Sequence, residues 1–200
     1  MHFPSLPELL LSLPAVLWAI TFHEFCHGYM AYILGDPTAE RAGRLTLNPL
    51  AHLDPVGAIM LLIFRFGWAK PVPIDSRYFK KPRRDLFLVS IAGVVGNLLT
   101  AALVGILVRI FPSFFLGNPA LRLFMFLMVV INVGLAVFNL IPIPPLDGSK
   151  VLYSIMPPHW LEKYFWLERY GFILLMLLLA LGVIQAVMNP IVFFLIRLIL

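Results

Sequence analysis

The chain has 200 residues and a mass of 22.6 kDa, with 61% hydrophobic residues, 12% charged residues and a mean hydropathy of +0.94. A soluble domain carries about 25% charged residues, and disorder requires low hydrophobicity, so the composition excludes both classes. The net charge of +5 is the difference between 15 Lys and Arg and 10 Asp and Glu, and nine of the 15 cations fall between Arg41 and Arg84. Such clustering is typical of the positive-inside bias of membrane proteins rather than of nucleic-acid binding. We therefore predict an all-α polytopic membrane protein with no nucleic-acid partner.

The N-terminal part of the chain is expected to begin with a full transmembrane helix. An apolar segment runs from about Leu6 to Leu34, long enough to cross a bilayer, and it lacks the basic start of a cleaved signal peptide. The apolar stretch Gly57–Phe66 has only ten residues, which predicts a re-entrant or interfacial segment. Residues 67–78 alternate at Val72 and Ile74 and contain two prolines, which predicts a small extended hairpin.

Three further apolar segments bring the expected number of full transmembrane helices to about four. They are Leu86–Val108, residues 123–140 and Tyr170–Met188, and none contains a charged residue. The proline-rich residues 141–148 end the third, and Asn189-Pro190 interrupts the chain after the fourth. We expect a single domain over residues 1–200, with a core at about 6–155 and C-terminal helices at about 165–200.

The basic loop sets the expected orientation. If residues 35–84 face the cytoplasm, the first and third spans both end on that side of the membrane. We expect a multi-pass protein of the plasma membrane, with residues 35–84 in the cytoplasm.

The first span contains His23-Glu24-Phe25-Cys26-His27, an HExxH pattern. On a helix, His23 and His27 project from one face and can share a tetrahedral zinc ion. Glu24 lies beside them, where it can act as general base on a water molecule. Ionisable residues at membrane depth cost several kcal/mol each, which favours a metal or water-filled site over a pair of packed polar residues.

A catalytic zinc ion needs a third protein ligand and an open fourth position. Asp147 is the only acidic residue between Asp85 and Glu162, and it follows a proline-rich break, although a turn Asp before Gly would explain it equally well. The other candidates are His52, Asp54, Cys26 and His159. Loop hydrogen bonding is the simpler role for His52, packing for Cys26 and an interfacial position for His159.

Three motifs together resemble the site-2 protease family of intramembrane zinc metalloproteases. They are HEFCH at 23–27, AGVVGN at 92–97 and NLIPIPPLDG at 139–148. The resemblance covers about residues 15–155 and is closest to the compact branch of the family, without a PDZ or CBS domain. Asn97 follows Gly93 by four residues, a spacing for which helix packing is the simpler role.

The resemblance implies specific roles for five residues. His23, His27 and Asp147 would bind one zinc ion per chain, and Glu24 would be the catalytic acid and base. Asn139 would lie near the substrate carbonyl, where an amide N–H could stabilise the oxyanion. The implied reaction is hydrolysis of a peptide bond in or beside a transmembrane segment of another membrane protein, within the lipid bilayer. Independently of the resemblance, the prolines and the alternation near residues 67–74 predict extended backbone, which could pair as an added strand with a substrate helix that has locally unwound.

Three other functions remain open from the sequence. A membrane metal-ion transporter would also place His, Asp and Glu in the membrane, but along a path rather than at one depth. A non-proteolytic membrane binding module would not need an intact HExxH. A metalloprotease that processes prenylated C-termini would take its third ligand from a Glu or His on a later helix, so a ligand role for Asp147 would exclude it.

Overall fold

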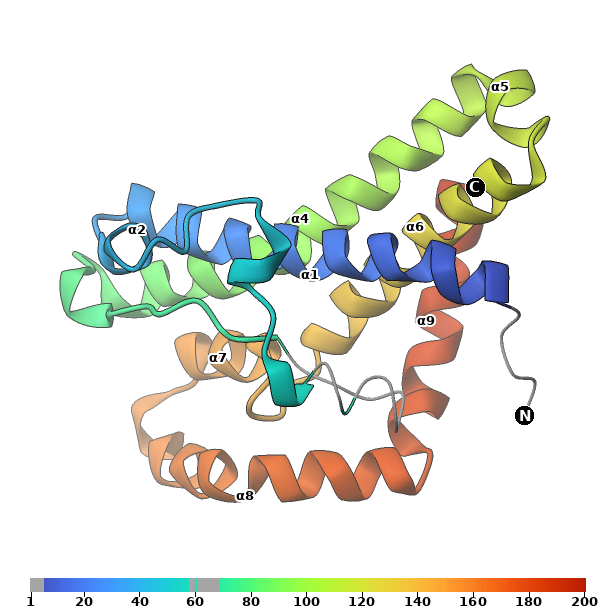
Figure 1. Cartoon of the computed structure of the whole chain (residues 1–200). Helices are drawn as coiled ribbons and strands as arrows, with labels where there is room; N and C mark the ends of the chain where they lie inside the picture. Colours follow the sequence, from blue (N-terminus) through green and yellow to red (C-terminus); the bar gives the residue numbers. More distant parts are fainter. Residues whose placement is uncertain (1–5, 58–59, 61–68) are drawn as a thin grey trace.

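The computed structural model describes residues 6–57, 60 and 69–200, and in this part of the chain the regular structure is helical (Figure 1). The helices are α1 (Leu6–Ile33), α2 (Thr38–Arg41), η1 (Pro49–Ala51), η2 (Ser76–Tyr78), α4 (Pro82–Ile110), α5 (Pro112–Leu116), α6 (Pro119–Asn139), α7 (Asp147–Ile155), η3 (Pro158–Trp160), α8 (Leu161–Ala180) and α9 (Val183–Ile199).

Three of these helices are long and apolar enough to cross a membrane. They are the Leu9–Ile33 part of α1, the whole of α4 and the whole of α6. All three coincide with spans expected from the sequence, and their ends follow local signals. Pro82 lies in the first turn of α4, and Asn118 caps α6 by accepting hydrogen bonds from the backbone N–H groups of Ala120 and Leu121. The prediction of an all-α polytopic membrane protein is confirmed.

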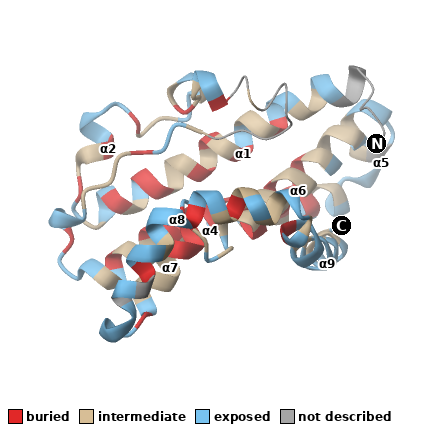
Figure 2. Ribbon diagram, turned by 90° about the horizontal axis from the view of Figure 1, so that it is seen from below, coloured by how far each residue is buried: buried red, intermediate tan, exposed pale blue. Residues whose placement is uncertain are grey.

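The three spans pack against one another, and their contact surface forms the core. α4 lies against both α1 and α6, and α1 also contacts α6. Small and β-branched residues at the centre, including Ala15, Ala101, Val129 and Val133, are fully buried. Figure 2 shows the buried residues concentrated on these helices and on α7, whereas α8 and α9 are mostly exposed. Small side chains let helix backbones approach closely, which is how membrane helices gain packing contacts.

The fourth expected span, Tyr170–Met188, is not one straight helix. α8 ends at Ala180, α9 begins at Val183, and the two meet at an angle of 75°. Gly182 lies at the bend with φ +74, in the left-handed region that glycine adopts without strain. The break expected at Asn189-Pro190 is absent, because Pro190 lies inside α9. The described residues thus contain three candidate spans, or four if the bent pair is one broken span.

The expected hairpin at 67–78 is not found among the described residues 69–78. The only β pairing in this part of the described chain is an isolated antiparallel bridge between Leu53 and Ala69, and residues 76–78 form η2. Pro71 and Pro73 lack backbone N–H groups, so they could only accept hydrogen bonds in a strand ladder. The expected re-entrant segment Gly57–Phe66 lies outside the described residues, apart from Gly57 and Met60.

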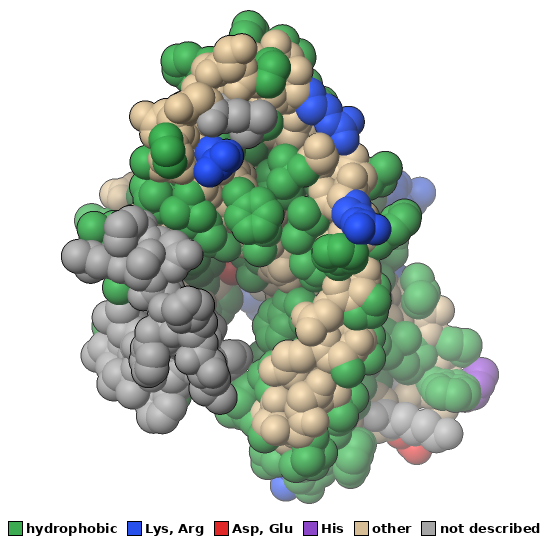
Figure 3. Space-filling model, turned by 90° about the vertical axis from the view of Figure 1, so that its right-hand side faces the viewer, with side chains coloured by type: hydrophobic (Ala, Val, Ile, Leu, Met, Phe, Trp, Pro, Cys, Tyr) green, Lys and Arg blue, Asp and Glu red, His purple; other side chains and the backbone are tan. Residues whose placement is uncertain are grey.

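The outer surface is rich in apolar side chains. For example, the exposed fractions of Leu99, Leu103 and Phe194 are 62%, 59% and 66%. Figure 3 shows one face on which hydrophobic side chains predominate and Lys or Arg residues are scattered. Such an extended apolar surface needs lipid as its solvent, so the chain is an integral membrane protein in contact with the bilayer.

Candidate metal centre

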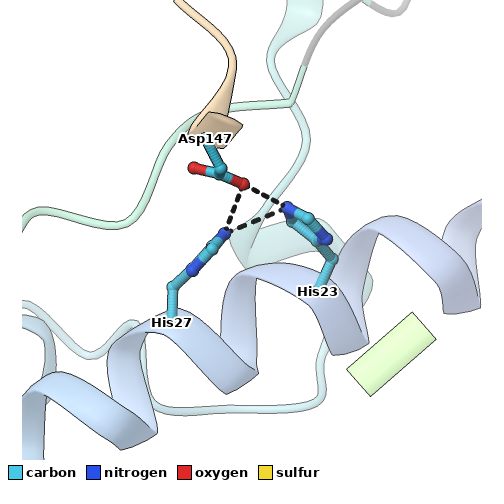
Figure 4. A group of neighbouring side chains, drawn as sticks. All are labelled: His23, His27 and Asp147. Carbon is cyan, nitrogen blue, oxygen red and sulfur yellow. Dashed lines mark hydrogen bonds and ion pairs between the residues drawn. The ribbon is translucent and has the colours of Figure 1, made fainter. Parts of the chain in front are cut away.

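The two histidines of HExxH lie on one face of α1, as helical spacing predicts. His23 and His27 are both 5% exposed, and their Nε2 atoms are 3.0 Å apart. The rings are nearly perpendicular, so both Nε2 atoms point at the same region (Figure 4). His27 Nδ1 donates to the backbone carbonyl oxygen of Val89 on α4 at 2.7 Å. A carbonyl oxygen only accepts, so the proton of a neutral His27 lies on Nδ1 and its Nε2 presents a lone pair.

Asp147 completes the cluster from the opposite side. It is the first residue of α7, which follows the loop that leaves α6. Its Oδ2 atom lies 3.0 Å from His23 Nε2 and 2.9 Å from His27 Nε2. The other oxygen, Oδ1, lies 3.4 Å from Lys150 Nζ. The structure therefore brings Asp147 to two histidines that lie 124 and 120 positions before it in the sequence.

The donor set fits a zinc ion. The ligand atoms of His23, His27 and Asp147 all lie within 4.8 Å of one another. Around a tetrahedral zinc with bonds of about 2.0–2.1 Å, ligand atoms would be roughly 3.3 Å apart, close to the separations found here. The Nε2 lone pair of His27 faces a carboxylate oxygen, and two acceptors at this distance need a cation or a proton between them. Two imidazoles and one carboxylate are a common catalytic zinc set.

Gly93 on α4 makes room for the two imidazoles. A Cβ atom at this position would lie 2.5 Å from His27 Nε2 and 2.7 Å from His23 Cε1. A Cβ carbon does not approach unbonded atoms this closely, so any side chain here would displace the two imidazoles. The close packing expected around Gly93 is confirmed, and it lies directly against the cluster.

Glu24 lies beside the cluster and contacts the extended segment at residues 69–75. Its Oε2 atom accepts a hydrogen bond from the backbone N–H of Val72 at 2.9 Å. Lys70 anchors one end of the segment through its N–H to the His52 carbonyl oxygen, and Asp75 anchors the other through its N–H to Asp36. The Glu24 carboxylate is therefore held in place by a segment that is itself fixed at both ends.

These residues share one cavity of about 440 Å³. His23, Glu24, His27, Asp147 and Asn139 line it, together with apolar side chains from α1, α6, α8 and residues 69–74. A water molecule occupies roughly 30 Å³ of liquid, so the space could also admit part of a peptide chain.

Asn139, the last residue of α6, lines the same cavity. Its Nδ2 group donates to the carbonyl oxygen of Leu135 at 3.0 Å, which leaves a second amide hydrogen for another acceptor.

The other candidate ligands are not part of the cluster. His52 is fully buried, with its Nε2 atom 2.8 Å from the carbonyl oxygen of Thr46, so it stabilises its loop as expected. Asp54 accepts a hydrogen bond from the backbone N–H of Gly57, and the ring of His159 makes an edge-to-face contact with that of Trp160. Cys26 lies against Gly96, in agreement with a packing role.

Sequence reasoning missed a role for Asn97. A packing role was expected, but its Oδ1 atom lies 2.7 Å from His23 Nδ1. Its Nδ2 group also donates to Asn132 Oδ1 at 2.8 Å, and Asn132 was not singled out at all. A polar residue inside an apolar span is a sequence signal for such contacts, because a buried amide needs partners.

Comparison with known proteins places the chain in a family. The sequence profile of peptidase family M50 matches residues 116–179. A protein of Bacillus subtilis (strain 168) named "Putative zinc metalloprotease YwhC" is 41% identical over 178 residues, which cover 86% of this chain and 80% of that protein. The chain belongs to peptidase family M50, the site-2 protease family. As an M50 member it is a metalloprotease.

Two mycobacterial relatives are longer than this M50 chain. "Putative zinc metalloprotease Rip2" of Mycolicibacterium smegmatis (strain ATCC 700084 / mc(2)155) is 31% identical over 172 residues, and the match covers 82% of this chain and 64% of that protein. The protein of the same name from Mycobacterium tuberculosis (strain ATCC 25618 / H37Rv) is 32% identical over 149 residues, and the match covers 72% of this chain and 54% of that protein. The chain thus spans between half and two thirds of the mycobacterial relatives. No solved structure gives a significant match.

Proposed function

We propose that this chain is an intramembrane zinc endopeptidase that hydrolyses a peptide bond in or beside a transmembrane segment of another membrane protein. The observation that carries the proposal is the meeting of Asp147 with His23 and His27 of the candidate membrane span α1, in a cavity that Glu24 also lines. Family membership supports the protease activity, and the position of the cluster supports the kind of substrate.

His23, His27 and Asp147 would hold one zinc ion per chain. The relatives are named as zinc metalloproteases, and two imidazoles with one carboxylate leave a fourth position open on a tetrahedral zinc ion. A zinc ion there supplies Lewis-acid chemistry, which polarises a carbonyl group and makes water more acidic.

Glu24 is the proposed general base and acid. Its carboxylate would take a proton from the attacking water and pass it to the leaving amine. The hydrogen bond from Val72 N–H to Oε2 fixes the side chain, so that its other oxygen can serve the water. Asn139 would donate its remaining amide hydrogen to the substrate carbonyl oxygen as negative charge develops there.

The depth of the site favours a transmembrane substrate. His27 and His23 are six and ten residues from the end of α1 at Ile33, roughly 9 and 15 Å along a helix that rises 1.5 Å per residue. A helical substrate hides its peptide bonds, so cleavage requires local unwinding. Ala69, Pro71, Val72 and Ile74 line the cavity, and the extended backbone of residues 69–74 would pair with the unwound segment as an added strand.

The orientation and boundaries of the domain are also proposals. The basic loop at residues 35–84 would face the cytoplasm from the plasma membrane, because its cations follow the positive-inside rule. The α1 end that leads into this loop and the α6 end that leads to Asp147 would then lie on the cytoplasmic side. We propose one domain over residues 1–200, with a catalytic core at about 6–155 and C-terminal helices at about 165–200.

The Glu24→Gln variant tests the proposal, with Glu40→Gln as its matched control. Glu40 lies on α2, is exposed and does not line the cavity. Membrane fractions from cells expressing each form are compared by sequencing newly formed peptide termini, and zinc is measured in the purified proteins. We expect fragments cut within transmembrane segments with wild type and Glu40→Gln, none with Glu24→Gln, and one zinc per chain throughout.

Two results would contradict the proposal. One is an identical fragment pattern with Glu24→Gln. The other is zinc flux into liposomes without cleavage of any protein, which would favour a transporter.

A further inference from the structure

Three buried polar side chains connect the three membrane spans behind the proposed metal site. His23 on α1, Asn97 on α4 and Asn132 on α6 are 5%, 0% and 0% exposed. His23 Nδ1 lies 2.7 Å from Asn97 Oδ1, and Asn97 Nδ2 lies 2.8 Å from Asn132 Oδ1. An amide placed inside a membrane span must find its partners within the protein. The three side chains form a continuous relay that ends at His23.

Two backbone carbonyl groups fix the direction of every hydrogen bond in this relay. Asn97 Nδ2 lies 3.0 Å from the carbonyl oxygen of Ala19, and Asn132 Nδ2 lies 2.8 Å from that of Met128. A carbonyl oxygen can only accept, so each amide must turn its NH₂ group toward its carbonyl. The oxygen of Asn97 is then left to face His23, and the oxygen of Asn132 faces Asn97.

This direction determines the tautomer of His23. Since Asn97 presents its oxygen, His23 Nδ1 must carry the hydrogen and donate it. His23 Nε2, which faces Asp147 Oδ2, is left with a lone pair in neutral imidazole. That form is the one a metal ion binds.

We propose that Asn97, oriented in turn by Asn132, is the positioning residue that holds His23 as a metal ligand in this orientation and tautomer. The inference rests on the proposed function, because it assumes that His23 binds zinc. His27 obtains the same support from the Val89 backbone carbonyl, which no side-chain substitution removes. The Nδ1 atom of His23 instead bonds to a side chain, that of Asn97 on another helix. Removing such a partner typically weakens metal binding by about 10- to 100-fold.

The test measures the zinc dissociation constant of the full-length purified protein by competition with a chelator. Asn97→Leu has a similar volume but leaves the His23 Nδ1–H without an acceptor, and we expect its zinc affinity to fall by about 10- to 100-fold. Asn132→Leu keeps the bond between Asn97 and His23 but removes one partner of Asn97. We expect a smaller loss in the same direction.

Thr100→Val is the matched control. Thr100 lies on the same helix, is 8% exposed, and bonds through its hydroxyl group to Gly96 and Trp18 rather than to His23. We expect its zinc dissociation constant to stay within about twofold of wild type, whatever its effect on thermal stability. An affinity loss for Thr100→Val equal to that of Asn97→Leu would overturn the proposal, as would wild-type affinity for Asn97→Leu.

A second measurement does not depend on whether the variants fold. Nitrogen NMR of the metal-free wild-type protein, labelled with ¹⁵N-histidine, reports which ring nitrogen of His23 carries the hydrogen. We expect the Nδ1–H form, and an Nε2–H form would refute the relay. If His23→Ala binds zinc as tightly as wild type, the proposed metal site fails instead, so the two failures are distinguishable.

Discussion

Replacing Gly93 with alanine tests how closely α1 and α4 must approach at the metal centre. The new Cβ atom would lie 2.5 Å from His27 Nε2 and 2.8 Å from His23 Nδ1. Unbonded atoms prefer separations of about 3.5 Å, so the imidazoles or the helices must move by about 1 Å. Metal–ligand distances tolerate only about 0.2 Å, and a misplacement of about 1 Å in a catalytic site can reduce activity roughly 100-fold. Overpacking of this kind also costs about 1–3 kcal/mol of stability.

We therefore expect Gly93→Ala to lose zinc affinity and to show proteolysis that is about 100-fold slower. Gly96→Ala is the matched control, because its Cβ atom would lie 2.6 Å from Cys26 Sγ instead of a ligand. Gly134→Ala, which meets nothing within 4 Å, controls for the gain in helix propensity of about 1 kcal/mol. Zinc is measured by chelator competition and cleavage by fragment analysis. Equal zinc binding and equal proteolysis in Gly93→Ala and Gly96→Ala would refute the reasoning.

Two further predictions concern the segment over the site and the loop that anchors it. Val72→Pro removes the N–H that donates to Glu24, whereas Val72→Ala keeps it. A hydrogen bond to a charged group is worth about 1.5–3 kcal/mol. We therefore expect proteolysis by Val72→Pro to be at least tenfold slower than by Val72→Ala, with unchanged zinc content. Equal rates in the two variants would contradict this prediction. His52→Ala leaves the carbonyl oxygen of Thr46 without its buried donor. An unsatisfied buried acceptor costs about 1–3 kcal/mol of stability, and each kcal/mol lowers the melting temperature by about 2–4 °C. We therefore expect the His52→Ala variant to melt several degrees lower and to retain one zinc per chain. Loss of zinc from this variant would instead make His52 a ligand.

The sequence predicted the membrane spans and the position of His23 and His27 on one helix face, because both depend on local geometry. Segments of about 20 apolar residues predict spanning helices, and α1, α4 and α6 agree with them to within a few residues. The four-residue spacing of His23 and His27 places both rings on one helix face in any fold that keeps the helix. The bend at Gly182 was missed, since apolar residues continue through it without interruption.

Only the tertiary structure decided which distant groups meet the histidines. Asp147 was one of several acceptable third ligands, and its local sequence fitted a simple turn equally well. Asn97 was expected to pack, yet it contacts His23, while Val72 reaches Glu24 through a backbone N–H that no sequence motif displays. Spacing along a helix is fixed by the backbone, whereas contacts between helices depend on how side chains interlock across α1, α4 and α6. Physically, therefore, the sequence determines the proposed ligands on one helix, and packing selects their partners from the others.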